Sequence, residues 1–152
     1  MANTQSMCTS FMGELLTATH NFTSGTGDTF KAALYVTTAT QNAATTSYSS
    51  TGEVSGLGYT AGGVAVTNGT SPSSTNSSAT AGTAYWTPSA SITYASVTLS
   101  TAFDCVLIYN STKSNKAVSV HTFGSQTVTA GTFTLTMPSN TTSTALIRLA
   151  TT

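Results

Sequence analysis

The chain has 152 residues, enough for one domain that buries about 70% of the surface of its unfolded chain and folds without disulfide bonds or metal. Only 5% of its residues are charged, four Lys or Arg balance four Asp or Glu, and 35 Thr and 22 Ser fill much of the remaining sequence. Four scattered cations exclude nucleic acid as a partner, and the lack of any apolar run near roughly 20 residues excludes a membrane-spanning helix.

The stretch CTSFMGELLTATH carries the one helical pattern of the chain. Apolar residues recur at i, i+3, i+4, i+7 and i+8 from Cys8 to Leu16, which predicts a short amphipathic helix with Thr4 or Ser6 as its cap. Such a helix packs against an edge of its own sheet or docks as an arm on a neighbouring subunit. We assign residues 1–24 to this helix and arm, and we expect no signal peptide because the start of the chain has no basic region.

After the turn-rich segment NFTSGTGD, the pattern is β throughout. The stretch TFKAALYVT at 29–37 places Phe30, Ala32, Leu34 and Val36 on one face of a strand, and glycines punctuate short strands within residues 51–68. The Ser/Thr/Gly-rich stretch at 69–83 predicts a long surface loop, because strands continue on both sides of it.

Further short strands follow to the end of the chain. They are expected at 84–87, 91–100, 103–110, 117–124, 126–130, 131–138 and 144–150. Many short strands with no helix between them indicate an antiparallel sandwich, jelly roll or barrel. We expect a mainly β fold in which residues 25–152 form a single antiparallel β-sandwich or jelly-roll-like domain. The short N-terminal helix precedes this domain.

The segment AGTFTLTMPSN at 130–140 shows how this chain builds a polar surface. Its apolar residues alternate with threonines only, so the outward face of the strand carries hydroxyl groups and no charge. Surface charge keeps monomers apart, and interface cores are depleted in Lys, Glu and Asp. We interpret the neutral threonine face as the surface of a protein that works packed in a large particle.

Two sets of residues are candidates for interaction. The expected hairpin loop STKSNK carries Lys113 and Lys116, either as a basic knob for an anionic partner or simply as lysines that keep a loop tip soluble. The second set consists of the aromatic residues Trp86, Tyr85 and Tyr94. They could line a sugar-binding groove, or they could pack in the core or between subunits, as aromatic residues of β-sandwiches often do.

Catalytic and metal-binding patterns are lacking in the sequence. Asp104 and His121 form a triad only with an arbitrary one of the 22 serines, and no GxSxG motif is present. Two Cys and two His are scattered too widely for zinc, and the four carboxylates form no glycosidase or calcium pattern. We therefore expect no enzyme activity, no catalytic residues, no cofactor and no metal.

The two cysteines, Cys8 and Cys105, are far apart in the sequence and belong to no CxxC motif. In a chain without an export signal they are expected to be reduced and buried, where each acts as a small apolar side chain. A disulfide bond between them or a reactive thiol is the alternative.

Several segments resemble small β-rich virion structural proteins of tailed bacteriophages. They are DTFKAALY at 28–35, YSSTGEVSGLGYTAGG at 48–63, AFDCVLIYNSTKSNKAV at 102–118, FGSQTVTAGTFTLTMP at 123–138 and ALIRLA at 145–150. The resemblance implies a non-enzymatic structural protein located in the virion, made in the host cytoplasm, with other virion proteins as partners. It carries over no functional residues.

We therefore expect a capsid decoration or cement protein, a homo-oligomer that binds the major capsid protein of the head shell in many copies. A tail- or fibre-associated virion protein is the first alternative. The second is a carbohydrate-binding β-sandwich that uses Trp86 and nearby tyrosines in host attachment.

Overall fold

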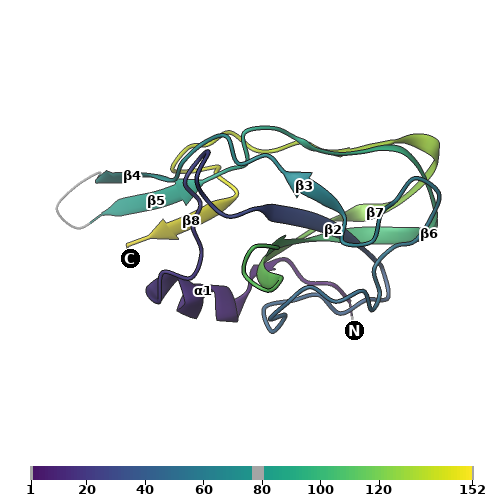
Figure 1. Ribbon diagram of the computed structural model, residues 1–152, viewed down its shortest axis with the longest axis horizontal. Helices are drawn as coiled ribbons and strands as arrows, with labels where there is room; N and C mark the ends of the chain where they lie inside the picture. Colours follow the sequence, from purple (N-terminus) through teal and green to yellow (C-terminus); the bar gives the residue numbers. More distant parts are fainter. Residues whose placement is uncertain (1, 77–80, 152) are drawn as a thin grey trace.

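The computed structural model describes residues 2–76 and 81–151 and is mainly β. Within these residues, eight strands form two antiparallel sheets and one short helix lies near the N-terminus, which confirms the predicted fold class. The elements are β1 (Ser6–Met7), α1 (Thr9–Leu16), β2 (Phe30–Val36), β3 (Val64–Val66), β4 (Ser73–Asn76), β5 (Gly82–Trp86), β6 (Ile92–Asn110), β7 (Lys116–Leu135) and β8 (Ile147–Ala150). The larger sheet has the order β1-β7-β6-β2-β3 and the smaller one β4-β5-β8 (Figure 1).

Strands β6 and β7 form one long antiparallel hairpin. The sequence predicts five shorter strands over this region, but the structure has two continuous ones. Bulges explain the difference, because the register of the ladder shifts between Tyr94 and Val97 and again between Leu99 and Phe103. A bulge bends the two strands and increases their twist without ending the pairing.

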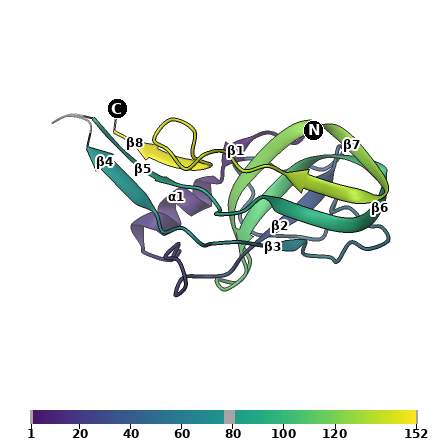
Figure 2. The same cartoon turned by 90° about the horizontal axis from the view of Figure 1, so that it is seen from above.

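The bent hairpin folds over and supplies both layers of the sandwich (Figure 2). Phe133 is paired with Tyr94, and Phe103 lies nine residues beyond Tyr94, so a straight strand would hold these side chains about 30 Å apart. The rings of Phe103 and Phe133 nevertheless meet edge to face at 5.0 Å between centroids. We call the layer that contains β2 the lower layer and the layer formed by the far end of the hairpin, around Tyr94 and Phe133, the upper layer. The hydroxyl group of Tyr94 donates a hydrogen bond to the carbonyl oxygen of Ala32 in β2 (2.9 Å), which ties the two layers together.

One side of the sandwich is closed by residues 52–63, which we call the covering segment. Val54 donates its backbone N–H to the carbonyl oxygen of Leu34 in β2 (3.0 Å). Thr98, in the bent part of β6, donates its own N–H to the carbonyl oxygen of Leu57 (2.8 Å). The covering segment therefore binds the edge of β2 in one layer and the backbone of β6 where it turns into the other.

The stretch expected to be a surface loop, residues 69–83, contains a strand instead. Ser73 to Asn76 form β4, which pairs antiparallel with β5, and β5 itself begins at Gly82. Residues 77–80 of the expected loop lie outside the described residues. The four side chains of β4 are exposed, so this strand has no buried face, and the sequence carries no alternation of apolar and polar residues that would predict it.

Helix α1 packs on the protein's own core, the first of the two arrangements expected for it. Cys8 and Phe11 are fully buried in the main hydrophobic cluster, whereas Leu16 is 90% exposed. The predicted cap is wrong, because Ser6 belongs to β1 and pairs with Val120 of β7. Cys8 occupies the N-cap position and its side chain makes no capping hydrogen bond.

Two glycine substitutions are expected to change stability in opposite directions. Gly63 has a φ of +69°, and a Cβ atom there would lie 1.7 Å from the carbonyl oxygen of Ala32, so Gly63→Ala should lower the free energy of unfolding by about 2 kcal/mol or more. Gly13 lies inside α1 with open space around it, so Gly13→Ala should raise that free energy by about 0.5–1 kcal/mol. Urea unfolding measures both, and a neutral Gly63→Ala would contradict the tight packing of the covering segment on β2.

Candidate functional site

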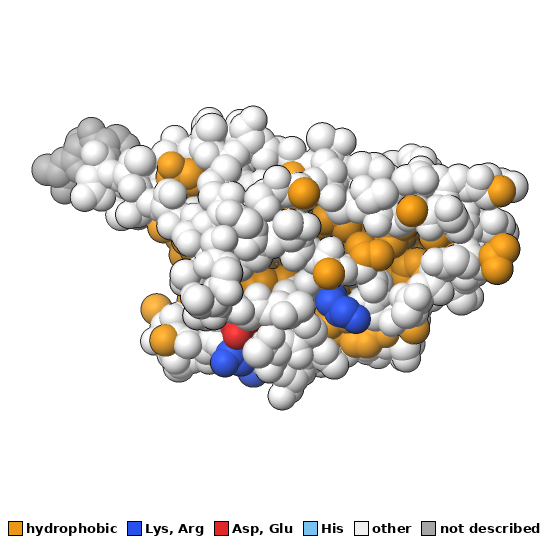
Figure 3. Space-filling view, turned by 45° about the horizontal axis from the view of Figure 1, so that its top comes forward, with side chains coloured by type: hydrophobic (Ala, Val, Ile, Leu, Met, Phe, Trp, Pro, Cys, Tyr) orange, Lys and Arg blue, Asp and Glu red, His pale blue; other side chains and the backbone are white. Residues whose placement is uncertain are grey.

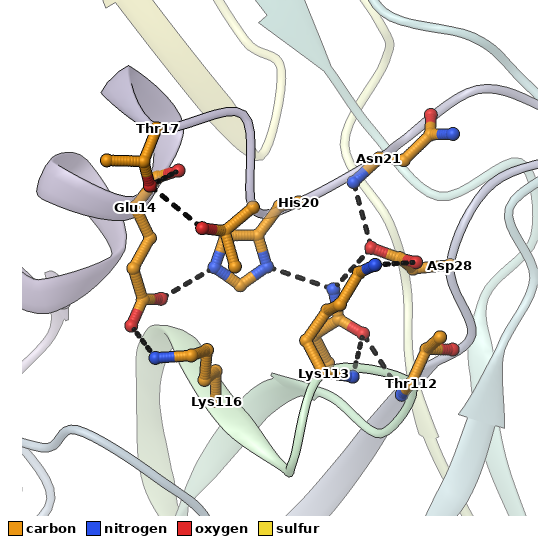
Figure 4. A network of polar contacts seen from close by, with 10 residues as sticks. Glu14, Thr17, His20, Asn21, Asp28, Thr112, Lys113 and Lys116 are labelled. Atoms are coloured by element: carbon orange, nitrogen blue, oxygen red, sulfur yellow. Dashed lines mark hydrogen bonds and ion pairs between the residues drawn. The ribbon is translucent and has the colours of Figure 1, made fainter.

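A network of polar side chains joins α1, the loop that follows it and the turn of the β6–β7 hairpin (Figure 4). It contains both of the lysines that the sequence analysis selected. Its charged and imidazole members are Glu14, His20, Asp28, Lys113 and Lys116. At its centre lies the side chain of Asn110, the last residue of β6, which is fully buried.

Glu14 on α1 is held by two partners. One carboxylate oxygen accepts a hydrogen bond from the Lys116 ammonium group, and the other lies 2.7 Å from Nε2 of His20. Burial favours the protonated carboxyl group, but the hydrogen bonds from Lys116 and His20 and the charge of Lys116 outweigh it and hold the pKa of Glu14 below its ordinary value. The helix is thereby attached to the strand that follows the hairpin turn.

Asn110 organises the other half of the network. Its side-chain oxygen accepts hydrogen bonds from the backbone N–H groups of Thr112 (3.1 Å) and Lys113 (3.2 Å) in the turn. These donors fix the orientation of the amide, so its nitrogen donates to Nδ1 of His20 (2.9 Å) and to a carboxylate oxygen of Asp28 (2.8 Å). His20 accepts at Nδ1, and its hydrogen lies on Nε2, facing Glu14.

Asp28 closes the network on the side of the loop. Its carboxylate accepts a hydrogen bond from the backbone N–H of Asn21 (2.9 Å) and lies 3.7 Å from the ammonium nitrogen of Lys113. Burial again favours protonation, but the hydrogen bonds from Asn110 and Asn21 and the charge of Lys113 keep the pKa of Asp28 below its ordinary value.

The structure places Lys113 and Lys116 at the hairpin turn, as the sequence predicts, and gives each an acidic partner in the same chain. The partner of Lys116 is Glu14, 102 positions away in the sequence, and no local pattern points to that pairing. Both lysine side chains are about 40% exposed, at 42% and 39%, but their charges are compensated.

The aromatic residues considered for sugar binding do not form an open platform. Trp86 is 2% exposed, and its ring contacts Phe22 at 4.8 Å between centroids. Its indole N–H donates to the carbonyl oxygen of Thr70 (2.9 Å). Tyr94 is buried as well, and Tyr85 lines a small apolar pocket of about 90 Å³ between α1 and the smaller sheet. Trp86 and Tyr94 therefore correspond to the alternative interpretation, in which the aromatic rings pack in the core, whereas Tyr85 is only partly buried.

A second polar cluster, which sequence reasoning missed, surrounds Glu53 in the covering segment. One carboxylate oxygen accepts from the hydroxyl group of Tyr59 (2.7 Å) and the backbone N–H of Gly62 (2.8 Å), and the other accepts from the hydroxyl group of Tyr48 (2.6 Å). Tyr48 stacks on Tyr109 with 4.8 Å between ring centroids. Burial, and then the charge of Glu53, raise the pKa of Tyr109 to about 12. The cluster keeps the covering segment folded against the sheet.

The imagined catalytic triad is not assembled in the described residues. The hydroxyl group of Ser119 lies 2.9 Å from Nε2 of His121, but Ser119 is 3% exposed, and burial lowers the pKa of His121 to about 4. Asp104 accepts a hydrogen bond from the side-chain amide of Asn3 (2.7 Å), and no described hydrogen bond joins it to His121. A triad requires a carboxylate that orients the imidazole ring.

Both cysteines are free and buried in the described structure. Burial, and for each a nearby carboxylate, raise the pKa of the Cys8 and Cys105 thiols to about 12. Within residues 2–76 and 81–151, no group of three His, Cys, Asp or Glu side chains is arranged to hold a metal ion. None of the described helices is long and apolar enough to cross a membrane.

Internal partners compensate most of the charge of the molecule. Two ion pairs use four of the eight charged side chains, and the carboxylates of Glu53 and Asp104 accept hydrogen bonds. Lys31 and Arg148 have no acidic partner among the described residues. Charged side chains accordingly occupy only small areas of the face shown in Figure 3.

No family model, curated protein or solved structure matches the chain.

Removing the side chain of Asn110 should destabilise the fold strongly. Asn110→Ala removes the donor to Nδ1 of His20, one of the donors to Asp28 and the side-chain acceptor of the Thr112 and Lys113 N–H groups, and we expect the free energy of unfolding to fall by at least about 3 kcal/mol. Asn21→Ala is the matched control, because the exposed Asn21 side chain accepts only one local hydrogen bond, from Thr23, and its loss should cost less than about 1 kcal/mol. Equal losses in urea unfolding would show that Asn110 does not organise the network.

Stability is expected to fall in acid through the same network. The pKa values of Glu14 and Asp28 are lowered by folding, so their contribution is complete above the ordinary values of 4.5 and 3.8 and is lost as the pH falls through the lowered ones. Glu14→Gln should therefore lose less stability than the unmodified protein between pH 7 and pH 3, and Lys116→Met should behave in the same way. Urea unfolding at a series of pH values tests this, and an unchanged pH dependence in both variants would refute it.

Proposed function

We propose that the protein is a non-enzymatic structural protein of a tailed-bacteriophage virion, a decoration or cement protein that binds the head shell in many copies. The observation that carries the proposal is the neutrality of its surface. Within the described residues, each Asp and Glu carboxylate has a lysine partner or accepts a hydrogen bond. Lys31 and Arg148 are the charged side chains whose charge no acidic partner compensates. The resemblance of several strand and turn segments to small virion proteins supports the same role.

A neutral surface suits repeated packing for a simple electrostatic reason. In a shell of many identical copies, every uncompensated charge recurs and repels its own images, whereas threonine hydroxyls hydrogen-bond to water or to protein at no such cost. Attachment would then depend on burial of apolar surface, at about 25 cal/mol per Å², together with hydrogen bonds. Large apolar side chains are available for that burial, since Leu16 and Leu57 are 90% and 80% exposed.

The alternatives receive different support. A tail- or fibre-associated position in the virion is compatible with the same neutral surface. Carbohydrate binding through Trp86 is not supported, because the ring that would stack on a sugar is buried against Phe22.

Intact particles test the proposed role. Mass spectrometry of particles purified from the producing host, followed by a map of the particle, should find the protein in many copies on the head shell. A single ring of copies on the tail would favour the alternative position. Absence from every particle would refute a virion role.

The attachment should resist salt and yield to denaturant. At about 1 M sodium chloride charges are screened within about 3 Å, yet we expect the protein to stay on its particle, because apolar burial is not weakened by salt. Urea or guanidinium should release it. Protein retained after washing across a salt series is the measurement, and release at about 0.3 M salt would instead indicate an electrostatic anchor such as Lys31 or Arg148, contradicting the neutral-surface argument.

A further inference from the structure

The outer edge of β7 has no neighbouring strand over most of its length. β1 covers it only where Met7 pairs with Ser119 and Ser6 with Val120. Beyond that point β6 lies on one side of β7, and no described strand lies on the other. We call residues 131–135, the last five residues of β7, the free edge. Figure 2 shows this end of β7 in the folded-over part of the hairpin.

A groove opens on the same side of the sandwich. It has a volume of about 150 Å³ and lies between the two layers of the bent hairpin. Leu135 and Ile92 line it from the upper layer, and Val106, His121 and Phe123 line it from the lower layer. On the opposite side, the covering segment closes the edge of β2. The sandwich is thus closed along one side and open along β7.

Unprotected edges pair with other strands, because they present a row of backbone N–H and C=O groups without partners. Proteins that remain monomeric block such edges with charged side chains, often lysine. The free edge has no such protection, since residues 117–147 contain no Lys, Arg, Asp or Glu. Two copies of this stretch can therefore approach each other without bringing like charges together.

We propose that the free edge of β7 pairs with the same edge of a second copy, antiparallel about a two-fold axis. The pairing joins the folded-over ribbons of the two chains into one four-stranded sheet and closes the groove between the layers of each. An identical edge on each partner gives a self-complementary contact. The row of exposed threonines continues across the contact, in which Thr–Thr neighbours are favourable cross-strand pairs. The inference rests on the homo-oligomeric part of the proposed function.

Two lysine substitutions, one in β7 and one in β6, distinguish a contact made by the free edge of β7 from a contact made elsewhere on the hairpin. Thr93 in β6 and Thr134 in β7 are paired across the ladder, are both exposed, and have their hydroxyl oxygens 3.5 Å apart. A lysine at either position therefore meets nearly the same surroundings in the monomer. In the proposed dimer, a lysine at position 134 lies on the strand that meets its own copy across the two-fold axis, whereas a lysine at position 93 lies one strand away from that contact.

Sedimentation velocity across a concentration series measures the result. We expect the unmodified protein to dimerise, Thr134→Lys to raise the dissociation constant about tenfold or more, and Thr93→Lys to leave it nearly unchanged. A protein that is monomeric at about 1 mM, or two variants with equal effects, would overturn the inference.

Cysteine cross-linking identifies the contact independently. Thr132→Cys and Thr134→Cys each place a thiol on the exposed face of the edge, and under mild oxidation the one nearest the two-fold axis should give a disulfide-linked dimer. The native cysteines do not compete, because both are buried. Thr93→Cys is the control and should remain uncrosslinked. If the protein forms an oligomer but none of the edge cysteines cross-links it, the edge contact is overturned and the virion role is not. If the dimer is cross-linked but the protein is absent from virions, the virion role is refuted and the edge contact is not.

Discussion

The edge-to-face contact of Phe103 with Phe133 is the interaction on which the rest of this structure depends. It requires the β6–β7 hairpin to fold back over its own sheet, because the same residues would lie about 30 Å apart along a straight ladder. Folding back gives Phe103 complete burial and brings Tyr94 within hydrogen-bonding distance of β2. Without it, the far half of the hairpin would be an isolated two-stranded ribbon with an exposed apolar face, which is marginally stable at best. The covering segment can join the two layers only because they already lie one above the other.

The alternation of apolar and polar residues was sufficient to predict the fold class and most strand positions, but not the strand connections. Residues 91–100 and 103–110 have the pattern of two strands, and the bulge between Leu99 and Phe103 makes them one bent strand. Such a bulge depends on which residues face each other across the ladder, and the sequence of one strand does not contain that information. The exposed strand β4 lies beyond sequence prediction for the opposite reason, since it has no buried face to impose a pattern.

The same limit applies to the candidate site. The sequence identified Lys113 and Lys116 as neighbours in a turn, because a turn is local. It gave no sign that Glu14 and Asp28 compensate them, because those carboxylates arrive from α1 and its following loop through tertiary packing. Trp86 could be selected as an aromatic residue of interest, but its burial depends on Phe22 and Phe30, which come from other parts of the chain. The sequence shows which residues are able to interact, but it does not show which partner each of them meets in the folded protein.

Threonine explains how the hairpin can have a polar outer face and yet carry no charge along the edge of β7. On the outer face of the hairpin it supplies the β-branched side chain that a pleated surface favours, and at Thr93 and Thr134 it places hydroxyl groups opposite each other across the ladder. A lysine would serve solubility equally well there and would also block the edge of β7. The chain instead uses two of its four cations to compensate partly buried carboxylates near the hairpin turn and leaves residues 117–147 without charge. A protein selected to remain a monomer would gain from the opposite distribution, so the placement of charge favours contact with other copies along this edge.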